Sequence, residues 1–568
     1  MKLKIICLCL LLVLRHQFTF GQTHHDNAAK FTRADTLRGM LTPLRTCYDV
    51  TYYHLDIKVD TLTKSISGSN EIQFKAVTDF DKMQIDLAEK MHIDKILFEN
   101  GTSLPFKREY GAVYIQISKT LQKDSVHEIT VFYHGTPQPA RRPPWDGGFV
   151  WSRDKLGNPW IAVTVQGDGA YLWWPNKEHQ SDEPDSMMIS VTIPQGLMDI
   201  SNGRLRAKTD LPEDWTRWDW FVSYPINNYN VTLNIAKYAH FNDFYVSADS
   251  DTLTLDYYVM PYNLEKAKAQ FKQVNSMLAC FEKLFGKYPF YRDGYKLVAS
   301  PHLGMEHQSA VAYGNKYRNG YLGRASSEIG LSFDFIIVHE SAHEWWGNSV
   351  TSKDIADMWI HEGFGAYTEA LYVECLNGYE AYLKYQNGKK YGVRNDRPII
   401  GYYNVNHRGS GDMYNKGSLF LHTLRHVIDN DSLWFDIIRG IPTTFKYQTI
   451  TTNDIVSYVN NKTGKDYSYL FDQYLKHTQI PQLQITVTKK GEQVTARYRW
   501  KADVQDFHMP IKVTTAKDKY EFIYPTTSWQ TTELGNIHPE EFRVAEELFY
   551  VDVKLTLIYL QANLEPKR

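Results

Sequence analysis

The sequence predicts a multidomain α+β protein with an N-terminal β-sheet domain, a mainly helical middle domain and a small C-terminal β domain. Its 568 residues exceed the roughly 100–200 residues of a single domain. Apolar and polar residues alternate from about Tyr48 to Tyr238 and again after Pro481, as they do in half-buried strands. From Asn263 apolar residues recur every three or four positions, as they do in helices, and the sequence stays mainly helical to about His477. The predicted domain boundaries are 36–240, 241–480 and 481–568.

The N-terminal domain is predicted from short alternating segments. Leu55, Ile57 and Val59 alternate with polar residues, and the same pattern surrounds Ile85. The stretch 135–148 contains four prolines, which favour a loop over a strand or helix. We therefore expect sheets on both sides of this loop.

The middle domain opens with a helical pattern. Apolar residues recur every three or four positions from Leu264 to Phe285, and Gly286 and Pro289 end the pattern. We therefore expect one amphipathic helix here, followed by mainly helical sequence.

The C-terminal domain returns to alternation, with Leu483, Ile485 and Val487 separated by polar residues. The segment 548–560 is apolar but contains Asp552 and other charged residues, so it is predicted as a strand and not as a membrane span. We expect no transmembrane anchor in the mature chain.

The overall composition is that of a globular protein, with 43% hydrophobic and 23% charged residues. The 63 basic and 65 acidic side chains nearly balance, which argues against nucleic acid or an anionic membrane as a partner. We therefore look for function in a local site and expect no nucleic-acid partner.

The first residues are typical of an export signal. Lys2 and Lys4 precede an apolar run of about ten residues, Ile5–Leu14, which is too short to span a bilayer. We expect residues 1–21 to be removed as a signal peptide and the protein to be periplasmic or extracellular. Three of the five cysteines would remain, which is enough for one bridge but assigns no pairing.

The most specific motif is His339-Glu340-Ser341-Ala342-His343, within a predicted helix over 333–347 that Ser332 would cap. Residues four apart lie on one helix face, so the two imidazoles can converge on one ion. Zinc is the metal that such histidines prefer in a tetrahedral site. Glu340 is angled beside that site and can accept a proton.

A catalytic zinc needs a third protein ligand, and Glu362 supplies a carboxylate nineteen positions after His343. Two histidines and one glutamate leave the fourth position open for water, whose pKa zinc lowers to about 7. The sequence therefore predicts one Zn²⁺ per chain, held by His339, His343 and Glu362.

This arrangement resembles the M1 family of zinc aminopeptidases, the gluzincin group that includes aminopeptidase N and leukotriene A4 hydrolase. Trp345-Trp346-Gly347-Asn348 and Trp359-Ile360-His361-Glu362-Gly363-Phe364 are also similar to the family's sequence around its metal ligands. The resemblance implies a thermolysin-like catalytic domain. Many members carry a large helical C-terminal domain for which this sequence leaves no room, so we expect a more open groove.

The resemblance also implies substrate contacts. Tyr414-Asn415-Lys416-Gly417 is similar to the family's tyrosine motif, in which the hydroxyl donates to the oxyanion formed on the scissile carbonyl. Gly304, Met305 and Glu306 match the exopeptidase motif, whose glutamate binds the free α-amino group. Leu303 and His307 depart from the usual Gly and Asn, which affects subsite shape.

Two further residues complete the predicted site. Gln166, in Val165-Gln166-Gly167-Asp168-Gly169-Ala170, resembles the glutamine that the β domain contributes to the amine site. The active site would then lie between the first two domains, where clefts are common. Glu369 follows Glu362 by seven positions, which places it two turns along the same helix face. We expect it to orient a ligand histidine through a hydrogen bond.

These residues predict a metallo-aminopeptidase that hydrolyses the N-terminal residue from peptides with a free N-terminus, with Glu340 as general base. A zinc endopeptidase or an epoxide-hydrolase-type relative is the first alternative, because the exopeptidase motif is altered at Leu303 and His307. An inactive binding homologue is the second.

Overall fold

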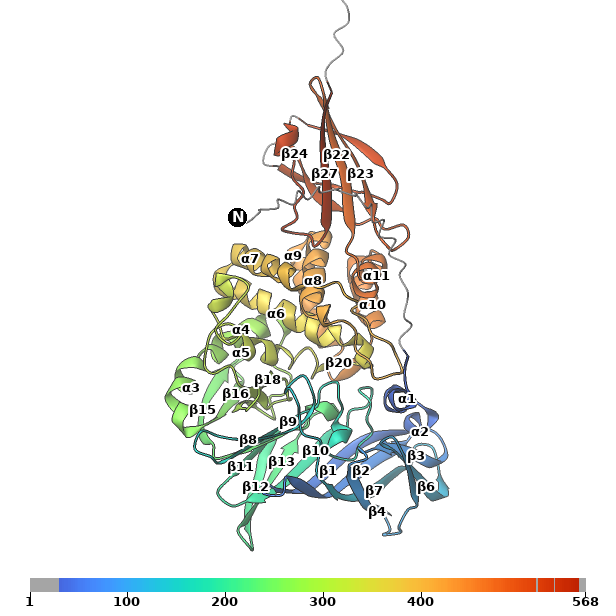
Figure 1. Cartoon of the computed structure of the whole chain (residues 1–568), viewed down its shortest axis with the longest axis vertical. Helices are drawn as coiled ribbons and strands as arrows, with labels where there is room; N and C mark the ends of the chain where they lie inside the picture. The colour runs from blue at the N-terminus through green and yellow to red at the C-terminus, as the bar shows by residue number, and fades with distance from the viewer. Residues whose placement is uncertain (1–29, 517–518, 536, 561–568) are drawn as a thin grey trace, which may run out of the picture.

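A computed structural model of the protein describes residues 30–516, 519–535 and 537–560. The body is elongated, with N-terminal sheets at one end, helices in the middle and a narrow C-terminal sheet at the other end (Figure 1). This confirms the predicted fold class. The expected signal segment, residues 1–21, lies outside the described residues.

The N-terminal part is built from three sheets preceded by two short helices, α1 (Arg33–Gly39) and α2 (Pro43–Thr46). The largest sheet has seven strands, in the order β12 (Arg204–Leu211), β13 (Trp215–Val222), β10 (Ser186–Pro194), β1 (Tyr48–Asp60), β2 (Ser65–Ala76), β7 (Val126–Gly135) and β4 (Met91–Phe98). The pairing is antiparallel except between β1 and β10. Leu55, Ile57 and Val59 are buried on one face of β1, as their alternation predicts.

Two smaller sheets complete this part. One runs β11 (Met198–Ser201), β14 (Leu233–Ala236), β9 (Pro159–Thr164) and β8 (Gly148–Arg153), and the other runs β3 (Phe80–Asp86), β6 (Ala112–Leu121) and β5 (Phe106–Glu109). The predicted loop 135–148 joins β7 to β8. Gln166 follows β9, so the end of this strand delivers it toward the middle of the molecule.

The middle part begins with a five-stranded sheet in the order β15 (Ala239–Val246), β16 (Thr252–Val259), β17 (Tyr295–Ala299), β19 (Val311–Tyr313) and β18 (Gly304–Met305). The single helix predicted between Leu264 and Phe285 is wrong, because two helices, α3 (Leu264–Gln270) and α4 (Gln273–Phe285), occupy this segment. At the break, the Val274 N–H bonds to the carbonyl three residues back. Gly286 ends α4 as predicted.

Seven more helices form the rest of the middle part: α5 (Phe335–Ala342), α6 (Trp359–Asn377), α7 (Tyr379–Lys389), α8 (Asn415–Ile428), α9 (Asp431–Thr444), α10 (Thr452–Thr463) and α11 (Ser468–Lys476). They lie between the two sets of sheets (Figure 1). A short parallel pair, β20 (Val350–Ser352) and β21 (Gln448–Ile450), joins distant segments of this part.

The C-terminal part is a four-stranded sheet, β26 (Gln530–Leu534), β23 (Gln493–Lys501), β22 (Gln482–Lys490) and β27 (Asp552–Leu560), with the hairpin β24 (Ile511–Ala516) and β25 (Lys519–Ile523) beside it. The strand predicted over 548–560 is confirmed as β27. Among the described residues, no helix has the length and apolar character needed to cross a bilayer.

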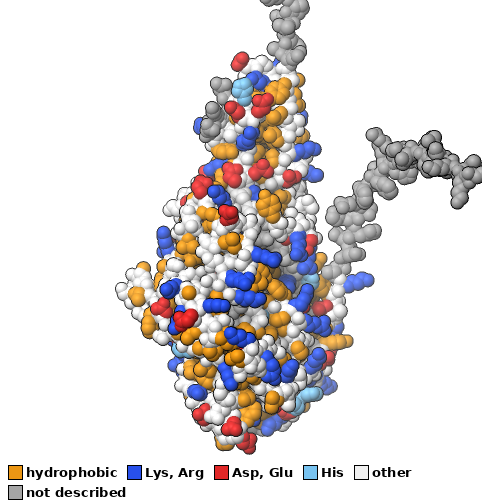
Figure 2. Space-filling model, turned by 60° about the vertical axis from the view of Figure 1, so that its left-hand side comes forward, with side chains coloured by type: hydrophobic (Ala, Val, Ile, Leu, Met, Phe, Trp, Pro, Cys, Tyr) orange, Lys and Arg blue, Asp and Glu red, His pale blue; other side chains and the backbone are white. Residues whose placement is uncertain are grey.

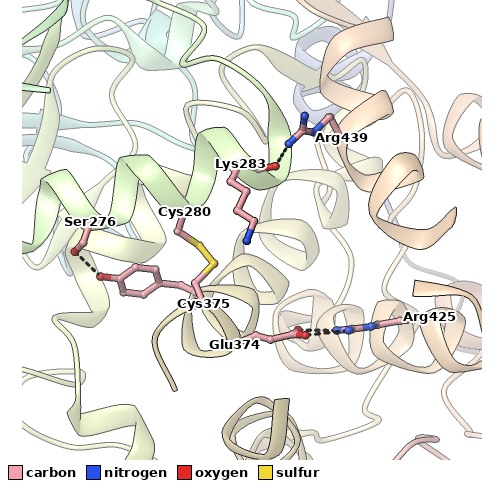
Figure 3. Close-up of a disulfide and its surroundings, with 8 residues drawn as sticks. Ser276, Cys280, Lys283, Glu374, Cys375, Arg425 and Arg439 are labelled. Carbon is pink, nitrogen blue, oxygen red and sulfur yellow. Dashed lines mark hydrogen bonds and ion pairs between the residues drawn. A yellow bond between two sulfur atoms is a disulfide. The ribbon is translucent and has the colours of Figure 1, made fainter. Parts of the chain in front are cut away.

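A disulfide ties two helices of the middle part together. Cys280 on α4 bonds to Cys375 near the end of α6, across 95 positions of sequence (Figure 3). Cys47 is free and buried. The sequence left the pairing open, and the structure assigns it.

On the face shown in Figure 2, basic, acidic and hydrophobic side chains are interspersed, with Lys and Arg most frequent around the middle.

Candidate metal centre

The helix that carries the His-Glu-x-x-His motif is shorter than predicted. α5 begins at Phe335, where the Asp334 side chain accepts hydrogen bonds from the backbone of Ile336 and Ile337. The predicted cap, Ser332, is wrong, because its hydroxyl donates instead to the Ile329 carbonyl at 2.7 Å. Asp334 is itself held by Gln270, at 2.9 Å, which fixes where the helix starts.

α5 also ends earlier than the predicted Gly347. After Ala342 the backbone tightens, and the Trp345 N–H bonds to the Ala342 carbonyl at 3.1 Å. His343 is the C-cap residue, but its φ of −64° and ψ of −17° keep it on the helical path. The two histidines of the motif therefore still lie one turn apart on one face.

The three predicted ligands converge. The Nε2 atoms of His339 and His343 lie 3.3 Å apart, and each lies 3.5 Å from Oε2 of Glu362. Donor atoms at the corners of a tetrahedron with zinc bonds of 2.0–2.1 Å are about 3.3 Å apart. The spacing of these atoms therefore fits a tetrahedral metal.

The hydrogen bonds that the ligands make to other residues leave the atoms that face the metal position free. Nδ1 of His343 bonds to the Trp346 carbonyl at 2.8 Å, so its Nε2 lone pair faces the centre. Oε2 of Glu362 is buried without a hydrogen-bond partner among the described residues. Burial alone would raise the pKa of Glu362, but the close approach of His339 and His343 outweighs it and holds that pKa well below its usual value. An anionic carboxylate with an unused oxygen is what a divalent cation requires.

Close packing around the ligands depends on one glycine. A Cβ on Gly365 would lie 3.1 Å from Cε1 of His343, tighter than ordinary van der Waals contact. Gly365 lies on α6 between Glu362 and Glu369, so this helix can approach α5 closely enough for both to contribute ligands.

Glu369 lies behind His339. Its Oε1 accepts a hydrogen bond from His339 Nδ1 at 2.8 Å. Its other oxygen accepts from the Tyr385 hydroxyl at 2.8 Å and from Lys389 Nζ at 2.6 Å. Tyr385 and Lys389 were not predicted from the sequence, because they lie on α7 and no spacing rule links them to the motif.

Glu340 faces the space beside the metal ligands. Its Oε1 lies so close to Gly304 that a Cβ on that glycine would be 2.5 Å away, so Gly304 is needed for the close approach of β18. Burial raises the pKa of Glu340 to about 7, although the charge of His339 opposes this. Oxygen atoms of Glu340 and Glu306 and a ring nitrogen of His343 lie within 4.8 Å of one another.

Gln166 and Glu306 meet at the other side of the centre. The Gln166 amide nitrogen donates to Glu306 Oε1, and also lies 3.1 Å from Oε1 of Glu362. Glu306 is 2% exposed, and burial raises its pKa while the charge of His343 opposes the rise. Gln166 and Glu306 thus form a site rich in hydrogen-bond acceptors next to the metal position.

Tyr414 closes the centre from the start of α8. Its ring stacks on that of His339 with centroids 5.9 Å apart, and burial raises its pKa well above 10, which keeps the hydroxyl protonated at neutral pH. The cavity that contains these residues is lined by Pro144, Trp145, Gln166, Leu303, Gly304, Met305, Glu306, Tyr321, Phe335, Ile336, His339, Glu340, His343, Glu362, Arg408 and Tyr414. All ten predicted site residues except Glu369 line it.

The two departures from the exopeptidase motif behave differently. Leu303 is half-buried and lines the cavity. His307 is fully buried behind it, and neither ring nitrogen has a hydrogen-bond partner among the described residues. Burial lowers the pKa of His307 well below its usual value, so the ring is neutral. Met305 is buried, with its sulfur accepting from Thr164 at 3.7 Å.

Known proteins share this segment. Residues 269–474 match the peptidase family M1 domain. The chain is 26% identical over 348 residues to glutamyl aminopeptidase from Rattus norvegicus, covering 56% of this chain and 34% of that protein. It is 27% identical over 221 residues to aminopeptidase N from Lactococcus lactis subsp. lactis, covering 34% of this chain and 25% of that protein. The chain thus spans about a third or less of the length of these relatives.

Solved structures share the fold. The M1 zinc metallopeptidase from Deinococcus radiodurans superimposes with a TM-score of 0.63 at 18% identity, covering 76% of this chain and 94% of that one. A two-domain M1 zinc metallopeptidase mutant bound to L-tryptophan gives a TM-score of 0.63 at 18% identity, with coverages of 76% and 95%. Residues 269–474 therefore match the peptidase family M1 domain, and the larger part of the chain shares the fold of these M1 zinc metallopeptidases.

Proposed function

We propose that this protein is a zinc aminopeptidase that removes the N-terminal residue from peptides with a free α-amino group. The relatives named above are aminopeptidases, and the three converging ligands suit zinc. The observation that carries the exopeptidase assignment is the contact between Gln166 and Glu306 beside the metal position. An endopeptidase has no need for a buried carboxylate at the end of its cleft.

Glu306 and Gln166 would hold the substrate's ammonium. A buried carboxylate pairs strongly with a cation that also hydrogen-bonds to it, and only the first residue of a peptide carries such a cation next to the scissile bond. The binding energy therefore aligns the first peptide carbonyl with the metal. We also propose the domain division at 36–240, 241–480 and 481–568, so that Gln166 comes from the first domain and the metal ligands from the second.

His339, His343 and Glu362 would hold the zinc, which supplies Lewis-acid polarisation of the carbonyl and activation of water. Glu340 would accept the proton of the attacking water and return it to the leaving amine. The Tyr414 hydroxyl would donate to the oxyanion that develops on the carbonyl oxygen. Glu369 would hold His339 in the tautomer whose Nε2 binds metal.

We further propose that the protein is exported to the periplasm or the exterior. Lys2, Lys4 and the apolar run after them support a signal peptide. The Cys280–Cys375 disulfide supports the same location, because such bridges persist in oxidising compartments. N-terminal sequencing of the mature protein should begin near residue 22, and an intact Met1 would contradict export.

The function is tested with aminoacyl-p-nitroanilides offered with a free or an acetylated amine. The wild type should hydrolyse only the free amines, and Glu306→Ala should lose about a hundredfold or more in kcat/KM, because the ammonium loses a charged hydrogen bond. Glu380→Ala, at an exposed glutamate on α7, is the matched control and should keep full activity.

Each rival gives a different result. Equal cleavage of acetylated substrates would favour a zinc endopeptidase. Loss of peptide activity with retained hydrolysis of a small epoxide would favour an epoxide-hydrolase-type enzyme. A zinc-loaded protein that hydrolyses neither would be a binding homologue.

A further inference from the structure

One charged residue in the cavity has no place in the proposed reaction. Arg408 lines the cavity with the metal ligands, Gln166 and Tyr414. Within the described part of the chain, its guanidinium makes no hydrogen bond or ion pair, although it is half-buried. The fully buried Arg45 and Arg425 are instead ion-paired, with Asp86 at 2.8 Å and with Glu374 at 2.7 Å. A guanidinium that lines a cavity and has no hydrogen-bonded anion of its own is a candidate for binding one from the substrate.

The segment around Arg408 is held at two points. Two residues before it, the Asn406 side-chain amide donates to the Gly167 carbonyl at 3.1 Å, next to Gln166. Two residues after it, the Ser410 N–H donates to the Pro398 carbonyl at 2.8 Å. Arg408 is therefore carried by a short segment that is held on both sides.

The guanidinium lies beside the turn that carries Gln166. A Cβ built on Gly167 would come within 3.7 Å of Arg408 Nη1. Gly167 directly follows Gln166, whose amide contacts Glu306. Arg408 is also close enough to Tyr414 for its charge to oppose, weakly, the burial that raises that tyrosine's pKa. The guanidinium thus shares the cavity with both the amine-binding pair and the tyrosine.

The acidic residue that follows Trp145 in the chain is already engaged. The two carboxylate oxygens of Asp146 accept hydrogen bonds from Arg142, one from Nε at 2.7 Å and one from Nη2 at 3.2 Å. The Arg142 hydrogen bond is the main reason that the pKa of Asp146 is lowered, and Arg408 contributes least among the causes. Arg142 therefore satisfies Asp146 and leaves Arg408 free to bind a ligand.

We propose that Arg408 is a specificity-determining residue that binds a carboxylate of the substrate. This rests on the proposed aminopeptidase function, which puts the α-amine on Gln166 and Glu306. The amine and the side chain of the first residue branch from one Cα, about 1.5 Å from the nitrogen. The nearest carboxylate is therefore the side chain of an N-terminal Asp or Glu, and the terminal carboxylate of a dipeptide is a second source of the same chemistry.

The shape of the Arg408 guanidinium favours a charged, planar ligand. A guanidinium can donate two parallel hydrogen bonds to a carboxylate, whereas an amide of the same shape offers one acceptor oxygen and repels with its NH₂. Trp145, which is 51% exposed at the rim of the same cavity, adds an apolar wall for the carbons of the side chain. The protein should therefore discriminate strongly between N-terminal glutamate and glutamine, which have the same shape.

The test compares Glu- with Gln-p-nitroanilide for the wild type, Arg408→Ala, Arg408→Lys and the control Arg141→Ala, an exposed arginine of the neighbouring loop. The wild type should favour glutamate by roughly 10- to 100-fold in kcat/KM, the range of a charge-assisted hydrogen bond. Arg408→Ala should abolish the preference, Arg408→Lys should keep part of it, and Arg141→Ala should keep it all.

A second arm identifies the source of the carboxylate. Ala-Ala and Ala-Ala-amide differ only in the terminal carboxylate. If the wild type prefers Ala-Ala, and Arg408→Ala removes that preference, the bound group is the terminal carboxylate of a short peptide. The proposal is overturned if the wild type discriminates in neither pair, or if Arg408→Ala leaves both ratios unchanged.

A binding measurement separates this proposal from the proposed function. Calorimetry with free L-glutamate and L-glutamine needs no turnover, and L-glutamate should bind roughly tenfold or more tightly to the wild type but not to Arg408→Ala. Preferential glutamate binding without hydrolysis of any anilide would support the carboxylate-binding role of Arg408 and contradict the aminopeptidase function. Hydrolysis of Ala-p-nitroanilide with equal binding of both amino acids would support the aminopeptidase function and contradict the role of Arg408.

Discussion

Glu369 accepts a hydrogen bond from Nδ1 of His339 across 2.8 Å, and the same carboxylate accepts from Lys389 at 2.6 Å. All three side chains are buried. The first hydrogen bond fixes the imidazole tautomer, and the second keeps Glu369 ionised, since Lys389 counters the burial that would raise its pKa. The position of His339 Nε2 therefore depends on a residue of α7, a helix that contributes no metal ligand.

Glu369→Gln should weaken zinc binding by 10- to 100-fold, the usual effect of losing a partner behind a ligand histidine. Competition with a chromophoric chelator measures the affinity without reference to activity. Because the substitution leaves Lys389 buried without its anion, Glu369→Gln/Lys389→Met should be run beside it. Unchanged zinc affinity in both variants would show that Glu369 serves stability alone.

Tyr414→Phe should lower kcat by about 100- to 1000-fold, the loss seen when one oxyanion donor is removed. KM should change little, because the hydroxyl acts on charge that develops after binding. Steady-state kinetics with Ala-p-nitroanilide measure both constants. Should KM rise while kcat holds, the hydroxyl contributes to ground-state binding instead.

The sequence predicted what depends on local periodicity. Spacing along a helix put His339 and His343 on one face, and their Nε2 atoms do lie 3.3 Å apart. Arg408 and Lys389 escaped notice because they reach the centre from other elements, through contacts that no spacing rule encodes. The start of α5 was misplaced for the same reason, since Ser332 and Asp334 are both good capping residues. Tertiary hydrogen bonds to Asp334 decide between them.

The signal peptide, the domain boundaries and the roles of the site residues remain predictions. The disulfide pairing was beyond the sequence because any two of Cys47, Cys280 and Cys375 could have paired. Only the packing of α4 against the end of α6 selects Cys280 and Cys375.

Removing the Cys280–Cys375 bridge should destabilise the protein by about 3–5 kcal/mol, because the bridge closes a loop of 95 positions and limits the unfolded chain. Urea unfolding of Cys280→Ser/Cys375→Ser, with and without dithiothreitol, measures this. Reductant should shift the wild type toward the variant and leave the variant itself unchanged. A wild type that unfolds identically with and without reductant would argue that the bridge contributes nothing.

The titration of Glu178 should lower the free energy of unfolding as pH rises. It lines a polar cavity with Arg38 and His179, and burial raises its pKa to about 7, although the hydrogen bond from Tyr171 opposes this. In the unfolded chain its pKa is near 4.5, so between pH 4.5 and 7 the unfolded state loses its proton first and gains relative stability. The stabilising contribution of the protonated form is complete below pH 4.5 and lost above pH 7.

Glu178→Gln removes that titration, so the variant should exceed the wild type in unfolding free energy at pH 8 by roughly 1–3 kcal/mol. At pH 4.5 the two proteins should be nearly equal. Urea unfolding at both pH values gives the difference, with the exposed Glu380→Gln as control. Nearby Asp86, Arg38 and Arg45 act on Glu178 in both directions, with Asp86 raising its pKa and the arginines lowering it. A variant that is less stable than the wild type at pH 8 would mean that the Tyr171 hydrogen bond needs a full carboxylate and outweighs the cost of burying it.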